Sequence, residues 1–175
     1  MYPRGVNSQT IQRIFQRADT NRNGSIDAHE LQRALSNGIN TEFNMHTVQM
    51  MIAMFDRDFN GTIECNEFEA LFNYIQRWRD CFMRFDTDRS GTIDAGELSV
   101  ALQSFGYTLS PNFTRMMIAR FDRTHRGVVA FDDFVYACIC LQQLTNAFRP
   151  YDLRGNGWAQ MSFEQFLSAA FSVIV

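Results

Sequence analysis

Apolar side chains recur at helical spacing before five polar segments of the chain. Each polar segment has one apolar residue immediately before it and another three positions earlier, and residues at that spacing share one face of a helix. These entering positions are Phe15 and Ala18, Ile52 and Phe55, Phe82 and Phe85, Ile118 and Phe121, and Phe148 and Tyr151. Apolar residues also follow four of the segments, at Leu31, Phe68, Leu98 and Phe134. The pattern predicts an all-α protein of five helix–loop–helix units.

The glycines of the five segments show how the units are connected. They are Gly24, Gly61, Gly91, Gly127 and Gly157, and their separations are 37, 30, 36 and 30 residues. Each short interval leaves room for one continuous helix that serves two loops, over 68–85 and over 134–151. Each long interval leaves room for two helices and a linker.

Three of the segments carry a complete set of oxygen ligands for a hard divalent cation. The calcium-binding helix–loop–helix supplies ligands from positions 1, 3, 5, 7, 9 and 12 of a twelve-residue loop, with glycine at position 6. Loops 19–30, 56–67 and 86–97 match every one of these positions. The glutamate at position 12 can bind through both oxygens, which favours calcium over magnesium, although magnesium can rest in a loop at low calcium. The predicted ligands are Asp19, Asn21, Asn23, Ser25, Asp27, Glu30, Asp56, Asp58, Asn60, Thr62, Glu64, Glu67, Asp86, Asp88, Ser90, Thr92, Asp94 and Glu97.

Position 8 of these three loops is isoleucine, at Ile26, Ile63 and Ile93. A β-branched residue suits the short strand by which two such loops pair. We therefore expect loop one to pair with loop two, and loop three with loop four.

The last two loops keep the glycine but lack the ligands. Loop four, at 122–133, has Arg126 at position 5 and a shorter carboxylate at position 12. Loop five, at 152–163, has Arg154 at position 3 and Phe163 at position 12. A guanidinium in place of a ligand oxygen repels the ion, so we expect both units to be structural and free of metal.

The odd number of units predicts an interface. Hands of this kind bury their apolar faces in pairs, so the fifth hand is left over. Its last helix, "FLSAAFSVIV", is strongly apolar, and an apolar surface without a partner marks an interaction site. A two-fold homodimer through the fifth hand is the simplest solution; the alternative is that this segment folds back onto its own domain.

Composition narrows the class of protein further. The formal net charge is −3 and the pI about 5.6, so no basic field indicates nucleic acid. There is no apolar run of about 18 residues for a membrane span, and the start "MYPRGVNSQT" has no secretory signal and no glycine after Met for myristoylation. We expect a cytoplasmic protein whose cysteines, Cys65, Cys81, Cys138 and Cys140, are reduced and buried; a redox or zinc role is the alternative.

The chain resembles the penta-EF-hand family, and within it most of all the apoptosis-linked calcium adaptor subgroup. The resemblance rests on "LQRALSNG", "MFDRD", "SFGYTLS", "AFDDFVYACICLQQLT" and "GNGWAQMSFEQFL" and covers about residue 8 to 175. It implies a short tail over 1–8 in place of the family's Gly/Pro-rich extension, and a penta-EF-hand domain over 9–175. The second loop, often irregular in that subgroup, is complete here, so we expect a third calcium site.

The resemblance also implies sites for partners. In the family, calcium at the first and third hands opens a hydrophobic pocket that takes Pro-rich segments of proteins in membrane trafficking, ESCRT-linked repair and vesicle coats. The matching pocket positions are Tyr74, Trp78, Phe105 and Phe163, and Ile75 is added because it shares a helix face with Tyr74 and Trp78. For Trp78, a purely structural place in the core is the alternative. The fifth hand mediates dimerisation in the family, and its large apolar side chains here are Trp158, Phe166 and Phe171.

The expected function is therefore that of a calcium sensor and adaptor in calcium signalling. A calcium buffer would bind tightly and barely open. A regulatory subunit of a calpain-like enzyme would prefer the fifth hand of another penta-EF-hand chain and form a heterodimer. We expect no enzymatic activity, because the three histidines lie far apart in the sequence and metal binding accounts for the carboxylates. Three bound calcium ions would change the formal charge from −3 to +3, which favours calcium-dependent association with acidic membranes.

Overall fold

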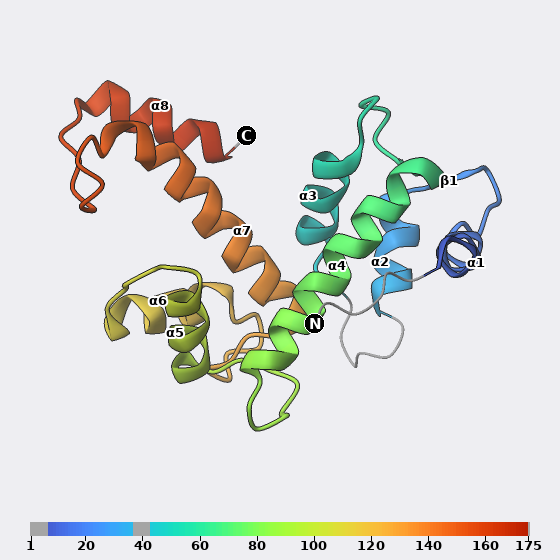
Figure 1. Cartoon of the computed structure of the whole chain (residues 1–175), viewed down its shortest axis with the longest axis horizontal. Helices are drawn as coiled ribbons and strands as arrows, with labels where there is room; N and C mark the ends of the chain where they lie inside the picture. The colour runs from blue at the N-terminus through green and yellow to red at the C-terminus, as the bar shows by residue number, and fades with distance from the viewer. Residues whose placement is uncertain (1–6, 37–42, 175) are drawn as a thin grey trace. The chain divides into compact units, whose positions relative to one another are not determined.

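The computed structural model describes residues 7–36 and 43–174 of the chain (Figure 1). Over these residues it contains eight α-helices, one 3₁₀ helix and two short strands, so the predicted all-α fold is confirmed. The first six residues of the expected tail and most of the first linker lie outside the described residues. The elements are α1 (Ser8–Ala18), β1 (Ser25–Ile26), α2 (Ala28–Ser36), α3 (Met45–Phe55), β2 (Ile63–Glu64), α4 (Cys65–Phe85), α5 (Ala95–Ser104), α6 (Pro111–Phe121), α7 (Phe131–Phe148), η1 (Arg149–Tyr151) and α8 (Phe163–Ile174).

The helices that follow loops two and three begin on side chains of the loops themselves. Glu64 precedes α4 and Asp94 precedes α5, and each forms a capping box with the glutamate three residues later, Glu67 or Glu97. A capping box satisfies backbone N–H groups that the first helical turn leaves without partners. The same short segment therefore ends the loop and starts the helix.

The loops pair as the isoleucines predict. Strands β1 and β2 are antiparallel, with Ile26 opposite Ile63. Ile93 and Val129 form a second antiparallel bridge, in which each backbone N–H donates to the other carbonyl at 2.9 Å. All three isoleucines are fully buried. The loops are thus joined in two pairs, one with two and three with four.

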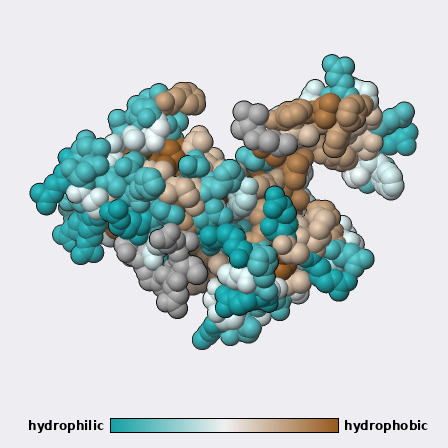
Figure 2. All heavy atoms as spheres, turned by 180° about the vertical axis from the view of Figure 1, so that it is seen from behind, coloured by the Kyte–Doolittle hydropathy of each residue, from teal (hydrophilic) through white to brown (hydrophobic). Residues whose placement is uncertain are grey.

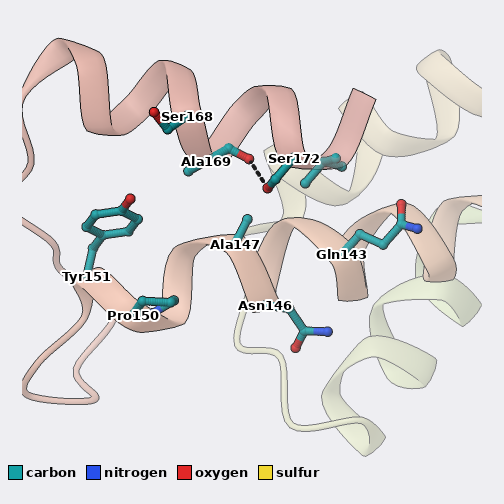
Figure 3. Close-up of a pocket in the computed structure, with 9 residues that line it drawn as sticks. Gln143, Asn146, Ala147, Pro150, Tyr151, Ser168, Ala169 and Ser172 are labelled. Atoms are coloured by element: carbon teal, nitrogen blue, oxygen red, sulfur yellow. Dashed lines mark hydrogen bonds between the residues drawn. The ribbon is translucent and has the colours of Figure 1, made fainter. Parts of the chain in front are cut away.

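The chain divides into two compact units, residues 1–133 and 134–175. In the first unit, α4 packs against α1 and α3, and α5 packs against α6. The rings of Phe15 and Phe68 meet edge to face there, with centroids 5.4 Å apart. The second unit holds the rest of α7, η1 and α8, and α8 runs alongside the end of α7 (Figures 1 and 3).

Two expectations need correction. The continuous helix expected over 134–151 ends as an α-helix at Phe148, and residues 149–151 form a 3₁₀ turn. Pro150 lies in that turn; it has no N–H to donate and its ring disfavours a continuing α-helix. Of the four cysteines, which are all free thiols, Cys138 is buried, Cys81 and Cys140 are half-buried, and Cys65 is exposed. Among the described residues, no helix is long and apolar enough to cross a membrane.

Candidate metal centres

The first aspartate of each complete loop organises the turn. Asp19 accepts hydrogen bonds from the backbone N–H groups of Asn23 (3.1 Å) and Gly24 (3.0 Å). Asp56 and Asp86 accept the equivalent pair from positions 5 and 6 of loops two and three, at 2.7–3.2 Å. The position-6 glycines have φ between 78° and 87°, a left-handed conformation that glycine adopts without steric cost. The three loops therefore share one backbone frame.

The glutamate at position 12 ties the end of each loop to its beginning. Glu30 accepts from the N–H of Thr20 (2.9 Å) and from the Thr20 hydroxyl (2.8 Å). Glu67 accepts from the N–H at position 2 of loop two at 2.8 Å, and Glu97 does so in loop three at 2.8 Å. Burial alone would raise the pKa of Glu30, but hydrogen bonds from Thr20, Asp27 and Asn21 outweigh it, so the pKa lies below its usual value. These bonds favour the ionised carboxylate, which is the form that binds a metal.

Loops two and three each bring three carboxylates together. Oxygens of Asp56, Asp58 and Glu67 lie within 4.8 Å of one another, and so do oxygens of the equivalent trio, Asp86, Asp88 and Glu97. Hydrogen bonds from the Ser90 backbone and hydroxyl lower the pKa of Asp88. Like charges at this spacing repel unless a cation lies among them. Loop one has an amide, Asn21, where the other two loops have their second carboxylate.

The remaining predicted ligands also belong to the loops, and most make local hydrogen bonds. At position 9, Asp27 and Asp94 accept the N–H of the glutamate three residues later at 2.8 Å, and so lie at the starts of α2 and α5. At position 5, the side-chain oxygens of Asn23, Asn60 and Ser90 accept the N–H of position 7 at 2.8–3.2 Å. The residues at position 7 are Ser25, Thr62 and Thr92, whose backbone carbonyls are the predicted ligands. In loop two, position 9 is Glu64, which lies at the N-cap of α4.

Loops four and five have the frame without the ligand set. Asp122 accepts from the N–H of Gly127 (2.6 Å), and Asp152 accepts from the N–H of Gly157 (2.8 Å). Burial opposes ionisation of Asp122, but hydrogen bonds from Thr124 and Gly127 lower its pKa to about 2. The position-12 residue of loop five, Phe163, is exposed. Sequence reasoning missed Arg123, at position 2 of loop four, which forms ion pairs with the two aspartates that end this loop.

Three of the predicted pocket residues form a ladder of aromatic contacts. Tyr74 meets Trp78 with ring centroids 6.1 Å apart, and Trp78 meets Phe105 at 6.4 Å. Two residues not predicted for the pocket extend the ladder: Phe55 meets Tyr74 at 5.2 Å, and Phe85 meets Phe105 at 5.9 Å. Their place one residue before loops two and three was a signal available in the sequence. The aromatic ladder, defined by these five residues, therefore links the starts of two candidate metal sites.

The other two predicted pocket residues lie elsewhere. Ile75 is buried in the core of the first unit, with 6% of its surface exposed. Phe163 belongs to the second unit and is 75% exposed at the start of α8. The structure thus brings Tyr74, Trp78 and Phe105 together, and their role in binding a partner stays a prediction.

The second unit carries a large exposed apolar surface. Trp158 is 81% exposed, and Phe166 and Phe171 on α8 are more than half exposed. Figure 2 shows apolar residues gathered over this unit, at the upper right of that view. A cavity of about 510 Å³ lies between α8 and the end of α7, where small side chains such as Ala147, Ser168 and Ala169 face one another across it (Figure 3).

Comparison with known proteins agrees with this geometry. The chain matches the model of the EF-hand domain pair over residues 8–73 and 75–139. A sorcin from Schistosoma japonicum is 56% identical over 97% of this chain and 99% of its own length. A peflin from Danio rerio is 41% identical over 97% of this chain, which spans 63% of that protein. The solved structure of a homolog of programmed cell death 6 protein from Leishmania major Friedlin has a TM-score of 0.84 at 31% identity, with 95% of each chain covered.

Proposed function

Because the chain belongs to the penta-EF-hand family of calcium-binding proteins, we propose that it is a calcium sensor that acts as an adaptor. Loops one to three bind calcium, the aromatic ladder opens, and the exposed rings take a Pro-rich segment of a partner protein. It is a calcium-binding protein and not an enzyme. We therefore expect the protein to act by exposing a binding surface for its partner when calcium binds.

The donor sets of loops one to three fit a hard divalent cation. The eighteen ligands predicted for these loops offer only oxygen atoms, as calcium requires. Bound calcium would supply the positive charge that the two three-carboxylate clusters lack. Glu30, Glu67 and Glu97 would each turn from the backbone N–H groups that they accept from here toward the centre of the loop. Each of these residues is buried or half-buried in the first turn of a helix, so its movement carries the helix along.

The single observation that carries the proposal is the aromatic ladder. Phe55 immediately precedes Asp56, the first ligand of loop two, and Phe85 immediately precedes Asp86, the first ligand of loop three. A rearrangement of either loop therefore moves one end of the ladder. Trp78, in the middle, contacts rings on both sides. An opened groove lined with aromatic rings suits a polyproline II segment, which is already extended and loses little entropy on binding.

The apolar surface of the second unit supports association through the fifth hand. Trp158, Phe163, Phe166 and Phe171 are large side chains that water would otherwise surround. A second copy of the chain is the simplest partner, because a two-fold interface needs one self-complementary patch. Another penta-EF-hand chain is the alternative partner, as expected of a regulatory subunit.

We place the protein in the cytoplasm, where the four free thiols are stable. Its partners there would be Pro-rich proteins of membrane trafficking. With three calcium ions bound, its formal charge would favour recruitment to acidic membrane surfaces.

The test uses the two tryptophans of the chain as a matched pair. Calorimetric titration with calcium, binding of an apolar dye, and binding of a synthetic Pro-rich peptide are measured on the intact protein and on two variants. We expect two or three calcium ions per chain and dye binding only with calcium. Trp78→Ala should lose peptide binding and keep calcium binding. Trp158→Ala should keep both and weaken the dimer in light scattering. Tight calcium binding without any dye signal would instead identify a buffer.

A further inference from the structure

Two neighbouring carboxylates are buried at the start of α7. Asp132 and Asp133 are the last residues of loop four, and only 4% and 3% of their surfaces are exposed. Arg123, from the beginning of the same loop, donates through Nε to both oxygens of Asp133, at 2.8 and 2.9 Å. Its Nη2 forms an ion pair with Asp132. One guanidinium therefore bridges both carboxylates.

The same two carboxylates reach a helix of another hand. The backbone N–H of Asn44 donates to Asp132 at 2.7 Å, and the Asn44 side-chain amide donates to Asp133 at 3.1 Å. The oxygen of that amide caps α3 by accepting the N–H of His46 at 2.9 Å. Asn44 thus uses both ends of its side chain, one for its own helix and one for the start of α7.

Aromatic rings complete the contact between these two helix starts. Phe131 meets Phe43 with centroids 6.1 Å apart and Phe82 at 5.5 Å, both edge to face. Phe43 and Phe82 are almost fully buried. Ion pairs and hydrogen bonds on one side, and edge-to-face ring contacts on the other, therefore join the first turn of α3 to the first turn of α7.

Charge explains why Arg123 stands at this position. Two buried carboxylates side by side cannot both stay ionised without a nearby cation. In loops two and three, where three carboxylates lie together, a metal ion would meet the equivalent need from outside under the proposed function. In loop four it is met from within the chain, by a side chain that is always charged and whose planar fork matches a carboxylate.

We propose that Arg123 is a built-in cation that makes the joint between α3 and α7 independent of calcium. None of the joint's residues is a predicted ligand of loops one to three. The joint holds the start of α3 near Asn44, while the other end of α3 leads directly into loop two. Resting on the proposed calcium switch, the joint would act as the fixed point about which α3 pivots when loop two rearranges.

The first test compares Arg123→Ala with Arg126→Ala by calorimetric unfolding, in chelator and again in saturating calcium. Arg126 is the matched control, because it belongs to the same loop and is exposed, as Arg123 is, while its Nε donates to the Thr124 hydroxyl at 3.1 Å and not to a carboxylate. We expect Arg123→Ala to lower Tm by about 5–10 °C relative to the control in both conditions, since it leaves two buried carboxylates without their cation. Arg123→Lys, which keeps the charge without the fork, should fall between the two.

The second test measures amide hydrogen exchange in the same variants. Arg123→Ala should speed exchange at Asn44 and in the first turn of α3 by about tenfold or more, while the first turn of α1 is unchanged. Equal Tm values for Arg123→Ala and Arg126→Ala would overturn the proposal, as would a Tm loss that disappears in calcium. The number of calcium ions bound should not change in any variant. If the wild-type protein bound no calcium, the proposed function would fail, while a Tm loss in chelator would still show the joint.

Discussion

Loops three and four lie side by side and have the same backbone, yet their chemistry differs. They are joined by the Ile93–Val129 bridge. Gly91 and Gly127 have φ values of 78° and 79°, and each donates its N–H to the first aspartate of its loop. The turn is therefore set by the first aspartate and the glycine alone. What the loop can hold is set by its other positions.

The two loops differ most clearly in the environment of the carboxylate at position 12. Glu97 lies with Asp86 and Asp88 in a cluster of three carboxylates. Asp133 is instead paired with Arg123, a cation of the chain itself. One frame thus serves both the calcium site proposed for loop three and the hand that we expect to be structural in loop four, and the following variants separate the two.

The largest contrast should come from the position-12 carboxylates. Glu97→Gln removes the bidentate ligand of loop three and should weaken calcium binding there at least about 100-fold. Asp133→Asn should leave the calcium count unchanged and lower Tm, because it removes the charge of a buried carboxylate that Arg123 pairs with. Calorimetric titration and unfolding scans measure the two effects. A change in calcium count for Asp133→Asn would show that loop four binds metal.

Acid should weaken the frame of loop four through Asp122. Its pKa is lowered from 3.8 to about 2 in the folded chain, since hydrogen bonds from Thr124 and Gly127 outweigh burial. A carboxyl with a lowered folded pKa contributes stability above its unfolded pKa, and this contribution is lost as the pH falls from about 3.8 to about 2. Asp122→Asn should therefore flatten the dependence of Tm on pH in this range in calcium-free buffer. Asp80→Asn, on the exposed side of α4, is the control and should follow the wild type.

Replacing Gly91 or Gly127 with alanine should lower the free energy of unfolding by the same amount, although the two loops differ in their ligands. No other atom would lie within 4 Å of an added Cβ at Gly91 or Gly127, so only the left-handed backbone opposes a side chain. Gly91→Ala and Gly127→Ala should each lower the free energy of unfolding by about 1–2 kcal/mol in chelator. Only Gly91→Ala should also weaken calcium binding. Unequal losses in denaturant titrations would contradict a shared frame.

The smallest effect concerns two threonine hydroxyls. The Thr87 hydroxyl donates to Glu97 at 2.8 Å, and the Thr124 hydroxyl donates to Asp122 at 2.8 Å. Thr87→Val and Thr124→Val should each lower the free energy of unfolding by about 0.5–1.5 kcal/mol in chelator. In saturating calcium the cost of Thr87→Val should shrink, because Glu97 would then turn to the metal. The cost of Thr124→Val should stay the same in the two denaturant titrations.

Much of the fold was predictable because its signals are local. The spacing of Phe82 and Phe85 before loop three, or of Ile52 and Phe55 before loop two, marks a helix face within one turn. The glycine at position 6 and the isoleucine at position 8 likewise act on their immediate neighbours. The helix end at Phe148 was placed three residues too late, although Pro150 was a local signal that favours an earlier end.

Contacts between hands could not be predicted in this way. The Asn44 amide and the Asp133 carboxylate are 89 residues apart, and no spacing rule connects them. The aromatic ladder likewise connects three helices. Whether Phe55 and Phe85 contact its other rings depends on how α3, α4 and α5 pack. Ile75 is buried while Tyr74 and Gln76 next to it are half-buried, which is also a result of packing.

The sequence by itself determined the five hands, the three complete ligand sets and the pairing of the loops. Each of these depends on residues within a twelve-residue loop and the helical turns next to it, where backbone geometry leaves few alternatives. The tertiary structure decided which carboxylates are paired inside the chain, at Arg123, and which of the described carboxylates cluster without such a pairing, at the loops where we propose calcium. That division depends on helices from different hands meeting in space, where burial makes an unpaired charge costly.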